Sequence, residues 1–213
     1  MSKVQDHARL LGFALLIMTF CWGCGKDEGI PNDPSPSVVN LIQNFNFESG
    51  SQPSVSGWYS YGAASGWEPI DTAWGGVNVK QDAPTGSSTW ALELISGSQA
   101  VITDATYFIS GQTGTSVYQL SLFGKACTPS PLPHPQSRIC LQKGPIKSSY
   151  AVTDSSCKCL ALDSLQMWKK YLITDTITSL PSDTIFVELI TLGTGPITET
   201  YRFDLIELTK KDP

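Results

Sequence analysis

Charged residues are scarce in this sequence of 213 residues: Asp, Glu, Lys and Arg make up 15% of it, against about 25% in an average soluble protein. Positive charge is the scarcer sign, since 14 Lys and Arg stand against 19 Asp and Glu and the net charge is −5. A protein that binds nucleic acid needs a basic surface to meet the phosphates. The composition therefore argues against a nucleic-acid partner.

Histidine is scarcer still, with only His7 and His134 in the sequence. A Ser or Cys triad would depend on one of them, and no G-x-S-x-G nucleophile elbow is present. The sequence also lacks a Gly-rich phosphate loop followed by Lys, and an E-x-D-x-E carboxylate run. Glu93 and Glu188 flank apolar strand residues, so we expect them to face outwards rather than to form a glycosidase pair. We therefore expect no catalytic activity.

The sequence has a single long hydrophobic run, LLGFALLIMTF at residues 10–20. As a helix this run rises about 16 Å, which is too short for a permanent membrane span. The charged residues 1–9 precede it. This order is typical of a signal peptide, and we predict one over residues 1–23.

The segment Cys21-Trp22-Gly23-Cys24 resembles a bacterial lipoprotein cleavage site, with the small Gly23 before Cys24 and Cys21 where the pattern prefers Leu. The GKDE that follows resembles the acidic tags of surface lipoproteins of the Bacteroidetes. The resemblance implies lipidation of Cys24, a flexible tether over residues 24–37, and a domain over residues 38–213. That domain would be anchored to the outer membrane, facing the cell surface or the periplasm. An ordinary secretory signal is the alternative.

Hydroxyl side chains take the place of the missing charges, with 25 Ser and 19 Thr. This composition favours strands over exposed helices, and no helical periodicity or internal repeat follows residue 24. Short β-prone runs separated by Gly, Pro and Ser turns predict an all-β fold, a β-sandwich or barrel. The predicted strands cover residues 44–48, 90–95, 99–102, 117–123, 137–142, 168–177, 184–190 and 201–208.

The opening NLIQNFNFE at residues 40–48, followed by Gly57-Trp58, resembles the start of carbohydrate-binding modules of the family four and nine type. The sequence also resembles later strands of these modules, in the same order, at residues 82–94, 118–121, 168–171 and 203–208. The resemblance implies a jelly-roll sandwich of the galactose-binding-like group that binds a glycan without catalysis. A protein-interaction, structural or adhesion module on the same fold is the alternative. Residues 126–164 depart from the pattern, and we expect them to elaborate the common sheet.

Four cysteines follow Cys24, at Cys127, Cys140, Cys157 and Cys159. Outside the cytoplasm such a set predicts two disulfides, with three connectivities open. In an extended Cys157-Lys158-Cys159 segment the two Cα atoms lie about 6.5–7 Å apart, at the limit for a bond. We therefore expect each to bond back to Cys127 or Cys140. A zinc site of four thiolates is the alternative, although the spacing lacks the usual two C-x₂₋₄-C pairs.

Aromatic residues crowd into residues 58–74 and indicate where a ligand could bind. We expect Trp58 and Trp90 to fill the sandwich core. Flat rings in loop-like sequence can stack on the C–H faces of sugars, while amides and carboxylates bind the hydroxyls. The predicted ligand-binding residues are Tyr59, Tyr61, Trp67 and Trp74, with Asp71, Asn78 and Gln81 as polar partners.

A structural calcium ion is a further expectation that comes from the resemblance. Modules with this opening often hold calcium where the first and last strands meet, and the matching residues here are Glu48 and Asp204. Two carboxylates brought together would repel each other unless a cation joined them, and calcium accepts carboxylate oxygens. The alternative is that both carboxylates face solvent or pair with Arg202 or a lysine.

Overall fold

The structure, a computed structural model, describes residues 38–49, 52–62, 66–70, 76–84, 89–96, 102–128, 137–144, 157–192 and 198–211. All of these belong to one compact unit, Val38–Pro213. The predicted signal peptide, the predicted lipidation site Cys24 and the predicted tether lie outside the described residues. No helix with the length and hydropathy of a membrane span occurs in the described part of the chain.

The described residues form strands and no helices. The strands are β1 (Glu48–Ser49), β2 (Gln52–Pro53), β3 (Trp58–Gly62), β4 (Gly66–Pro69), β5 (Val77–Lys80), β6 (Ala91–Ile95), β7 (Ile102–Ile109), β8 (Gly114–Ala126), β9 (Arg138–Gly144), β10 (Lys158–Ala161), β11 (Lys169–Ser179), β12 (Thr184–Leu192) and β13 (Thr200–Lys211).

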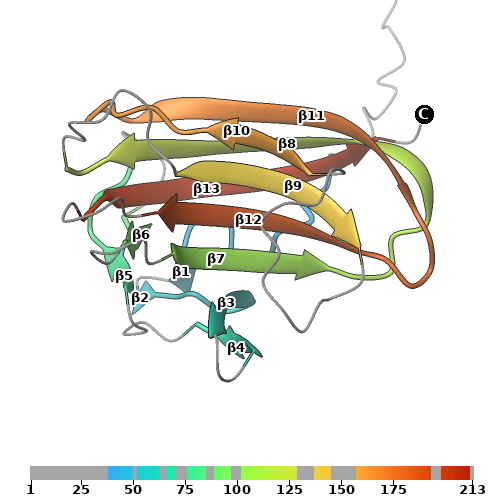
Figure 1. Cartoon of the computed structure of the whole chain (residues 1–213), viewed down its shortest axis with the longest axis horizontal. Coiled ribbons are helices and arrows are strands. Elements are labelled where there is room, and N and C mark those ends of the chain that lie inside the picture. The colour runs from blue at the N-terminus through green and yellow to red at the C-terminus, as the bar shows by residue number, and fades with distance from the viewer. Residues whose placement is uncertain are drawn as a thin grey trace, which may run out of the picture. The chain divides into compact units, whose positions relative to one another are not determined.

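Two large sheets form the two layers of a sandwich (Figure 1). The first has the strand order β10-β9-β12-β7-β3-β4 and the second the order β11-β8-β13-β6-β5, while β1 and β2 form a separate ribbon. Strands that pair do so in antiparallel fashion. The all-β sandwich predicted from the sequence is therefore confirmed.

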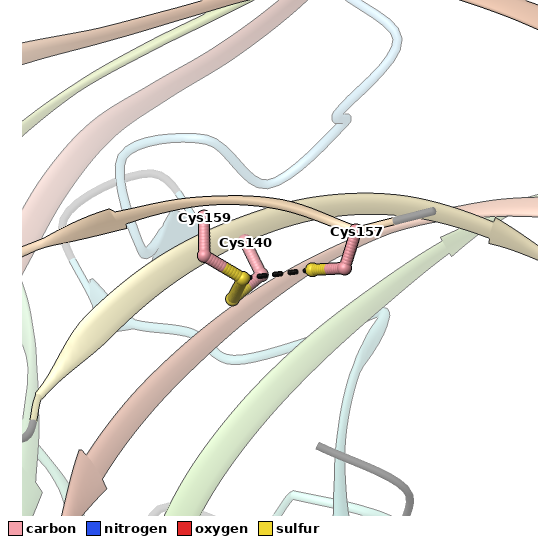
Figure 2. Close-up of side chains that lie close together, drawn as sticks. All are labelled: Cys140, Cys157 and Cys159. Carbon is pink, nitrogen blue, oxygen red and sulfur yellow. Dashed lines mark hydrogen bonds between the residues drawn. A yellow bond between two sulfur atoms is a disulfide. The ribbon is translucent and has the colours of Figure 1, made fainter. Parts of the chain in front are cut away.

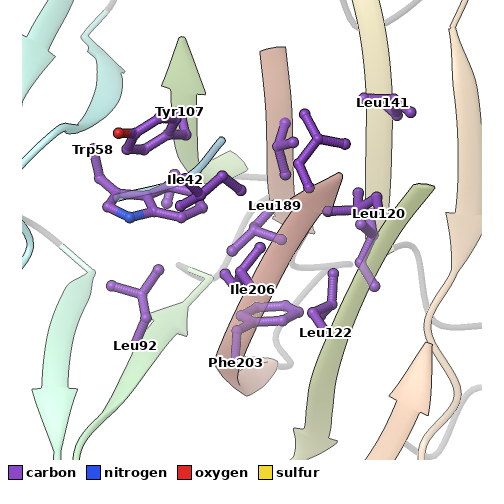
Figure 3. Packing of buried hydrophobic residues seen from close by; sticks show 14 of the residues in the cluster. Ile42, Trp58, Leu92, Tyr107, Leu120, Leu122, Leu141, Leu189, Phe203 and Ile206 are labelled. Carbon is purple, nitrogen blue, oxygen red and sulfur yellow. The ribbon is translucent and has the colours of Figure 1, made fainter. Parts of the chain in front are cut away.

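The core lies between the inner faces of the two sheets, and alternation along the strands supplies it (Figure 3). On β8, Tyr118, Leu120 and Leu122 are buried in the core, whereas Gln119 between them turns to the outer face. Trp58 is 0% exposed, as predicted, and its ring lies 5.3 Å from the ring of Tyr107. Trp90 differs from the prediction, because it is only half-buried.

Several short strands near the start of the domain are not anticipated by the sequence. The predicted strand over residues 44–48 is mostly a turn, in which Phe47 has a φ of +56°, and only its last residue joins β1. Strands β3, β4 and β5 are short and Gly-flanked, so they lack the long alternation that marks β8 or β11. Gly76 before β5 is required there, since its φ is +92° and a Cβ would lie 2.7 Å from the carbonyl oxygen of Ile95.

One disulfide forms among the described cysteines, between Cys140 on β9 and Cys159 on β10. The second predicted bond is not formed, and Cys127 and Cys157 each keep a thiol. The reason is their place in the fold: Cys127 follows β8 in the five-stranded sheet, whereas Cys157 precedes β10 in the six-stranded sheet. Residues 126–164 supply β9, which the predicted strand over residues 137–142 anticipates, and β10.

Lysines from the six-stranded sheet close the outer edge of β11, the first strand of the other sheet. Lys143 of β9 donates to the carbonyl oxygen of Thr178, and Lys158 of β10 donates to the carbonyl oxygen of Thr174. Backbone groups on a sheet edge otherwise remain open to water or to another strand. These two bonds tie the sandwich together along one side.

A buried carboxylate anchors β3 to β7. Asp104 is 2% exposed, and its Oδ1 accepts hydrogen bonds from the Ser60 hydroxyl at 3.1 Å and from the backbone N–H of Tyr61 at 3.2 Å. The Thr106 hydroxyl donates to its other oxygen at 3.4 Å. Burial, only partly opposed by these hydrogen bonds, raises the pKa of Asp104 from 3.8 to about 6.

This pKa predicts a pH-dependent stability that Asp104→Asn should remove. Between about pH 4 and pH 6 the native state holds a proton at Asp104 that the unfolded chain has released, so stability falls as pH rises through this window. Titration of Asp104 lowers the free energy of unfolding by about 3 kcal/mol across this window and does not lower it further at higher pH. Denaturant unfolding of both proteins from pH 4 to pH 7 measures it. Parallel profiles for the wild type and Asp104→Asn would show that Asp104 does not titrate in this way.

Candidate functional site

The outer face of the five-stranded sheet carries two adjacent rows of side chains across β11, β8 and β13. Ser121 stands opposite Leu172 on one side and Glu207 on the other, and Gln119 stands opposite Thr209 in the next row. Because side chains alternate along a strand, these residues share the face that points away from the core. Three strands that are distant in the sequence therefore meet at one place.

A hollow of about 300 Å³ opens on this face. Leu172, 53% exposed, offers it an apolar surface. The other lining side chains are polar or charged, so they can donate and accept hydrogen bonds. The lining consists of Gln119, Ser121, Lys170, Leu172, Glu207 and Thr209.

A change of register in β13 lies at the border of the hollow. The pairing of β13 with β8 shifts between Asp204 and Glu207, and Leu205 within the shift has a φ of +50°. Irregularities of this kind bend a strand and redirect its side chains. Here the pairing resumes at Glu207, so the shift determines which β13 side chains face the hollow.

A network of opposite charges crosses the same face beyond the register shift. The Arg202 guanidinium donates from Nε to Glu93 at 2.7 Å and also pairs with Asp82, while Lys125 lies 2.5 Å from Asp82. Burial opposes ionisation of Asp82, but hydrogen bonds from Lys125 and Arg202 hold its pKa below the usual value. Glu93 faces outwards as expected, yet it is only 4% exposed. The charges on this part of the sheet are therefore neutralised by one another.

The predicted ligand-binding residues do not form one group among the described residues. Tyr59 and Tyr61 lie on β3 of the six-stranded sheet, where Trp67 of β4 is the register partner of Tyr61. Asn78 on β5, and Gln81 just after it, belong to the five-stranded sheet. The predicted Asp71 and Trp74 lie outside the described residues.

Tyr59 takes part in an aromatic row on the outer face of the six-stranded sheet. Its ring centroid lies 5.4 Å from that of Phe108 on β7, which lies 6.0 Å from that of Phe186 on β12. Tyr59 is half-buried by these contacts. This row is a second surface where a ring-shaped ligand could stack.

The polar residues of the hollow were missed as a group, although the sequence held part of the signal. The alternation over residues 117–123 already assigns Gln119 and Ser121 to a polar outer face. Lys170, Glu207 and Thr209 become their neighbours only through the pairing of β8 with β11 and β13. Alternation along one strand assigns its side chains to a face, but it does not identify the residue that stands opposite on the next strand.

The two predicted calcium ligands come from segments that touch. The N–H of Ile206 donates to the carbonyl oxygen of Phe45 at 2.8 Å, which joins the segment before Glu48 to the segment after Asp204. The Glu48 carboxylate accepts the backbone N–H groups of Thr89 and Trp90. Asp204 is 0% exposed. Arg202, named as an alternative partner, is engaged by Glu93 and Asp82 instead.

No protein-family profile and no curated protein matches the sequence. Solved structures do match. The carbohydrate-binding module TmCBM61, solved with β-1,4-galactotriose, is 14% identical with a TM-score of 0.51, over 81% of this chain and 99% of that chain. A putative sugar-binding protein from Bacteroides thetaiotaomicron is 11% identical with a TM-score of 0.51, over 81% and 100% of the two chains.

A third match is to an enzyme, and it covers a smaller part of that protein. The enzymatically active domain of tailspike protein 4 from bacteriophage CBA120 is 14% identical with a TM-score of 0.52, over 81% of this chain but 22% of that chain. At such identities the likeness concerns the fold alone. The chain therefore has the jelly-roll β-sandwich fold that is also found in carbohydrate-binding modules.

Proposed function

We propose that this domain is a non-catalytic carbohydrate-binding module whose glycan lies in the hollow on the outer face of β11, β8 and β13. The observation that carries the proposal is the hollow itself, where five polar side chains surround one exposed leucine. Its volume of about 300 Å³ is at the lower end of the range for small-molecule sites. A pocket of this size suits one or two sugar rings rather than a folded partner.

The lining matches the chemistry of a sugar. Each sugar hydroxyl both donates and accepts hydrogen bonds, and the amide of Gln119 and the hydroxyls of Ser121 and Thr209 can do the same. Glu207 adds a charged acceptor and Lys170 a charged donor. Leu172 offers an exposed apolar surface on which the C–H face of a sugar ring can pack.

The strands hold these groups in place before any ligand binds. Gln119 and Ser121 lie in the middle of β8, which pairs with β11 on one side and with β13 on the other. A site on paired strands needs no ordering of the backbone on binding, which lowers the cost of association. The same geometry supports selective binding without a moving loop.

The aromatic row at Tyr59 is a second candidate surface for the same function. We infer that Tyr61 and Trp67 would extend a glycan site on this sheet, whereas Asn78 and Gln81 would contribute only if the ligand also reached the other sheet. Asp71 and Trp74, the other predicted ligand-binding residues, lie outside the described residues. The protein-interaction alternative is favoured by the continuation of the same outer face along β11, where Thr174, Thr176 and Thr178 are exposed. One binding experiment separates these possibilities.

A glycan-array screen of the chain, followed by calorimetry with the best glycan, should locate the site. Gln119→Ala and Glu207→Ala should each weaken binding, by up to about tenfold for the neutral amide and more for the carboxylate. Tyr59→Ala tests the second candidate surface on the other sheet, and it should leave the affinity unchanged when the glycan lies in the hollow. The bound glycan should remain uncleaved.

Loss of glycan binding with Tyr59→Ala alone would instead assign the site to the aromatic row. Cleavage of the glycan would contradict the non-catalytic role. An array without any bound glycan would favour the protein-interaction alternative.

We further propose a structural calcium ion held by Glu48 and Asp204 with backbone carbonyls. The contact between their two segments and the hard oxygen ligands support it. Calcium would add a positive charge beside the Asp204 carboxylate, which is 0% exposed and accepts the backbone N–H of Leu205 at 2.7 Å.

Excess chelator should lower the thermal midpoint by several degrees, and added calcium should restore it, because an ion bound only by the native state stabilises that state. Asp204→Asn should abolish the response, whereas Glu207→Gln in the hollow should keep it. A thermal midpoint that changes with neither chelator nor calcium would rule the ion out.

We also propose that the chain is a lipoprotein, acylated at Cys24 and held on the outer membrane. The support is the sequence pattern of residues 1–28. In a host that processes lipoproteins, mass spectrometry should find a mature chain that begins with an acylated Cys24, and Cys24→Ser should release the protein from membranes. A mature chain that starts elsewhere without acyl mass would contradict the anchor.

A further inference from the structure

Three sulfur atoms meet at the edge of the six-stranded sheet (Figure 2). Cys140 and Cys159 are register partners on β9 and β10, and their sulfurs form the disulfide. The Sγ of Cys157 lies 2.7 Å from the Sγ of Cys159. All three sulfurs lie within 4.8 Å of one another. A thiol is therefore in contact with a disulfide.

The local chain explains why Cys157 is the third member. Cys157 stands immediately before β10 and Cys159 is the second residue of that strand, and side chains two apart on an extended chain share a face. Cys140 is 1% exposed, whereas Cys157 is half-buried and Cys159 is exposed. The contact between the thiol and the bridge thus lies on the solvent side of a buried sulfur.

We propose that Cys140, Cys157 and Cys159 form a thiol–disulfide exchange site. The Cys157 thiol loses its proton, and the thiolate attacks the Sγ of Cys159. The Cys157–Cys159 bond forms, the Cys140–Cys159 bond breaks, and Cys140 leaves as a thiolate that takes up a proton. Electrons and protons balance within the molecule, so the step requires no oxidant or reductant.

A metal site made from the same three sulfurs is a weaker interpretation. Three thiolates could hold a soft metal ion, but the Cys140–Cys159 bond would first need two electrons from an external reductant. Exchange needs only the contact that already exists. The geometry therefore favours exchange over metal binding.

Exchange changes the covalent attachment of β10 to the sheet. The Cys140–Cys159 bond links β10 covalently to β9, whereas a Cys157–Cys159 bond lies within one segment of chain and leaves β10 on four pairs of residues. Burial of Cys140 disfavours the thiolate that must leave. We therefore expect the Cys140–Cys159 isomer to dominate and the other to be a minor state.

Trypsin makes the two isomers easy to distinguish, because Lys158 lies between Cys157 and Cys159. Complete cleavage places each cysteine in its own peptide: residues 139–143 carry Cys140, residues 148–158 carry Cys157, and residues 159–169 carry Cys159. Each possible bond then joins a different pair of peptides. The masses of the linked pairs report the connectivity directly.

The test keeps the folded full chain near pH 8.5, where thiolate is abundant, without redox reagents. Acidic denaturant with N-ethylmaleimide then blocks every thiol before digestion. We expect mostly Cys140–Cys159 with a labelled Cys157, and a Cys157–Cys159 isomer with a labelled Cys140 at about 1% or more. If every chain carries the Cys140–Cys159 bond, the proposal fails. A Cys140–Cys157 bond would also overturn it, since Cys159 would not be the sulfur attacked.

Variants give an independent check. Cys157→Ser should remove the minor isomer and leave the Cys140–Cys159 bond complete. Cys127→Ser is the matched control, because Cys127 lies after β8 on the other sheet, and it should leave the isomer ratio unchanged. A minor isomer ratio that changes with Cys127→Ser would show that the exchange does not belong to this cluster.

Discussion

Burial of one face of each sheet against the other is the interaction on which this domain depends. The inner face of the five-stranded sheet contributes residues such as Leu120 and Phe203, and the six-stranded sheet contributes residues such as Trp58 and Leu189, all of them 0% exposed (Figure 3). Fully burying side chains of this size stabilises by about 1.5–3 kcal/mol each. Because alternate side chains serve this core, the remaining ones are free to form the two outer faces.

The outer faces use that freedom in different ways. On the six-stranded sheet, the amide of Gln142 donates to Glu188 at 2.7 Å, and Asp104 is bonded by Ser60 and Tyr61. These polar groups are buried, so they need partners, and each holds two strands together. On the five-stranded sheet the charges around Arg202 are also paired, but the neighbouring side chains of β8 and β13 line a hollow. The hollow and the paired charges thus occupy adjacent parts of one surface.

The fold was largely predictable because most of its long strands either alternate, as in β8, or are rich in β-branched residues, as in β12, although β7 was not predicted beyond Ile102. Residues 117–123, 168–177, 184–190 and 201–208 all lie within or almost within observed strands. The sequence did not reveal the short strands of residues 58–80, since strands of four or five residues that include Gly or Trp are too short to show an alternating pattern. The candidate site was harder, because Gln119 and Glu207 become neighbours only through strand register. The disulfides were half predictable for the same reason: spacing indicated that Cys159 bonds elsewhere than Cys157, but not which sheet holds Cys127.

The lysines that cap β11 have a consequence beyond the packing of one chain. An edge strand of eleven residues is long enough to act as a template on which a second chain could continue the sheet. Here Lys143 and Lys158 occupy carbonyl oxygens that an incoming strand would need, and each ammonium would have to be displaced from its bond first. Growth of the sheet past this edge therefore carries an electrostatic penalty at two points. A strand from a second copy of the domain is therefore hindered from pairing with β11.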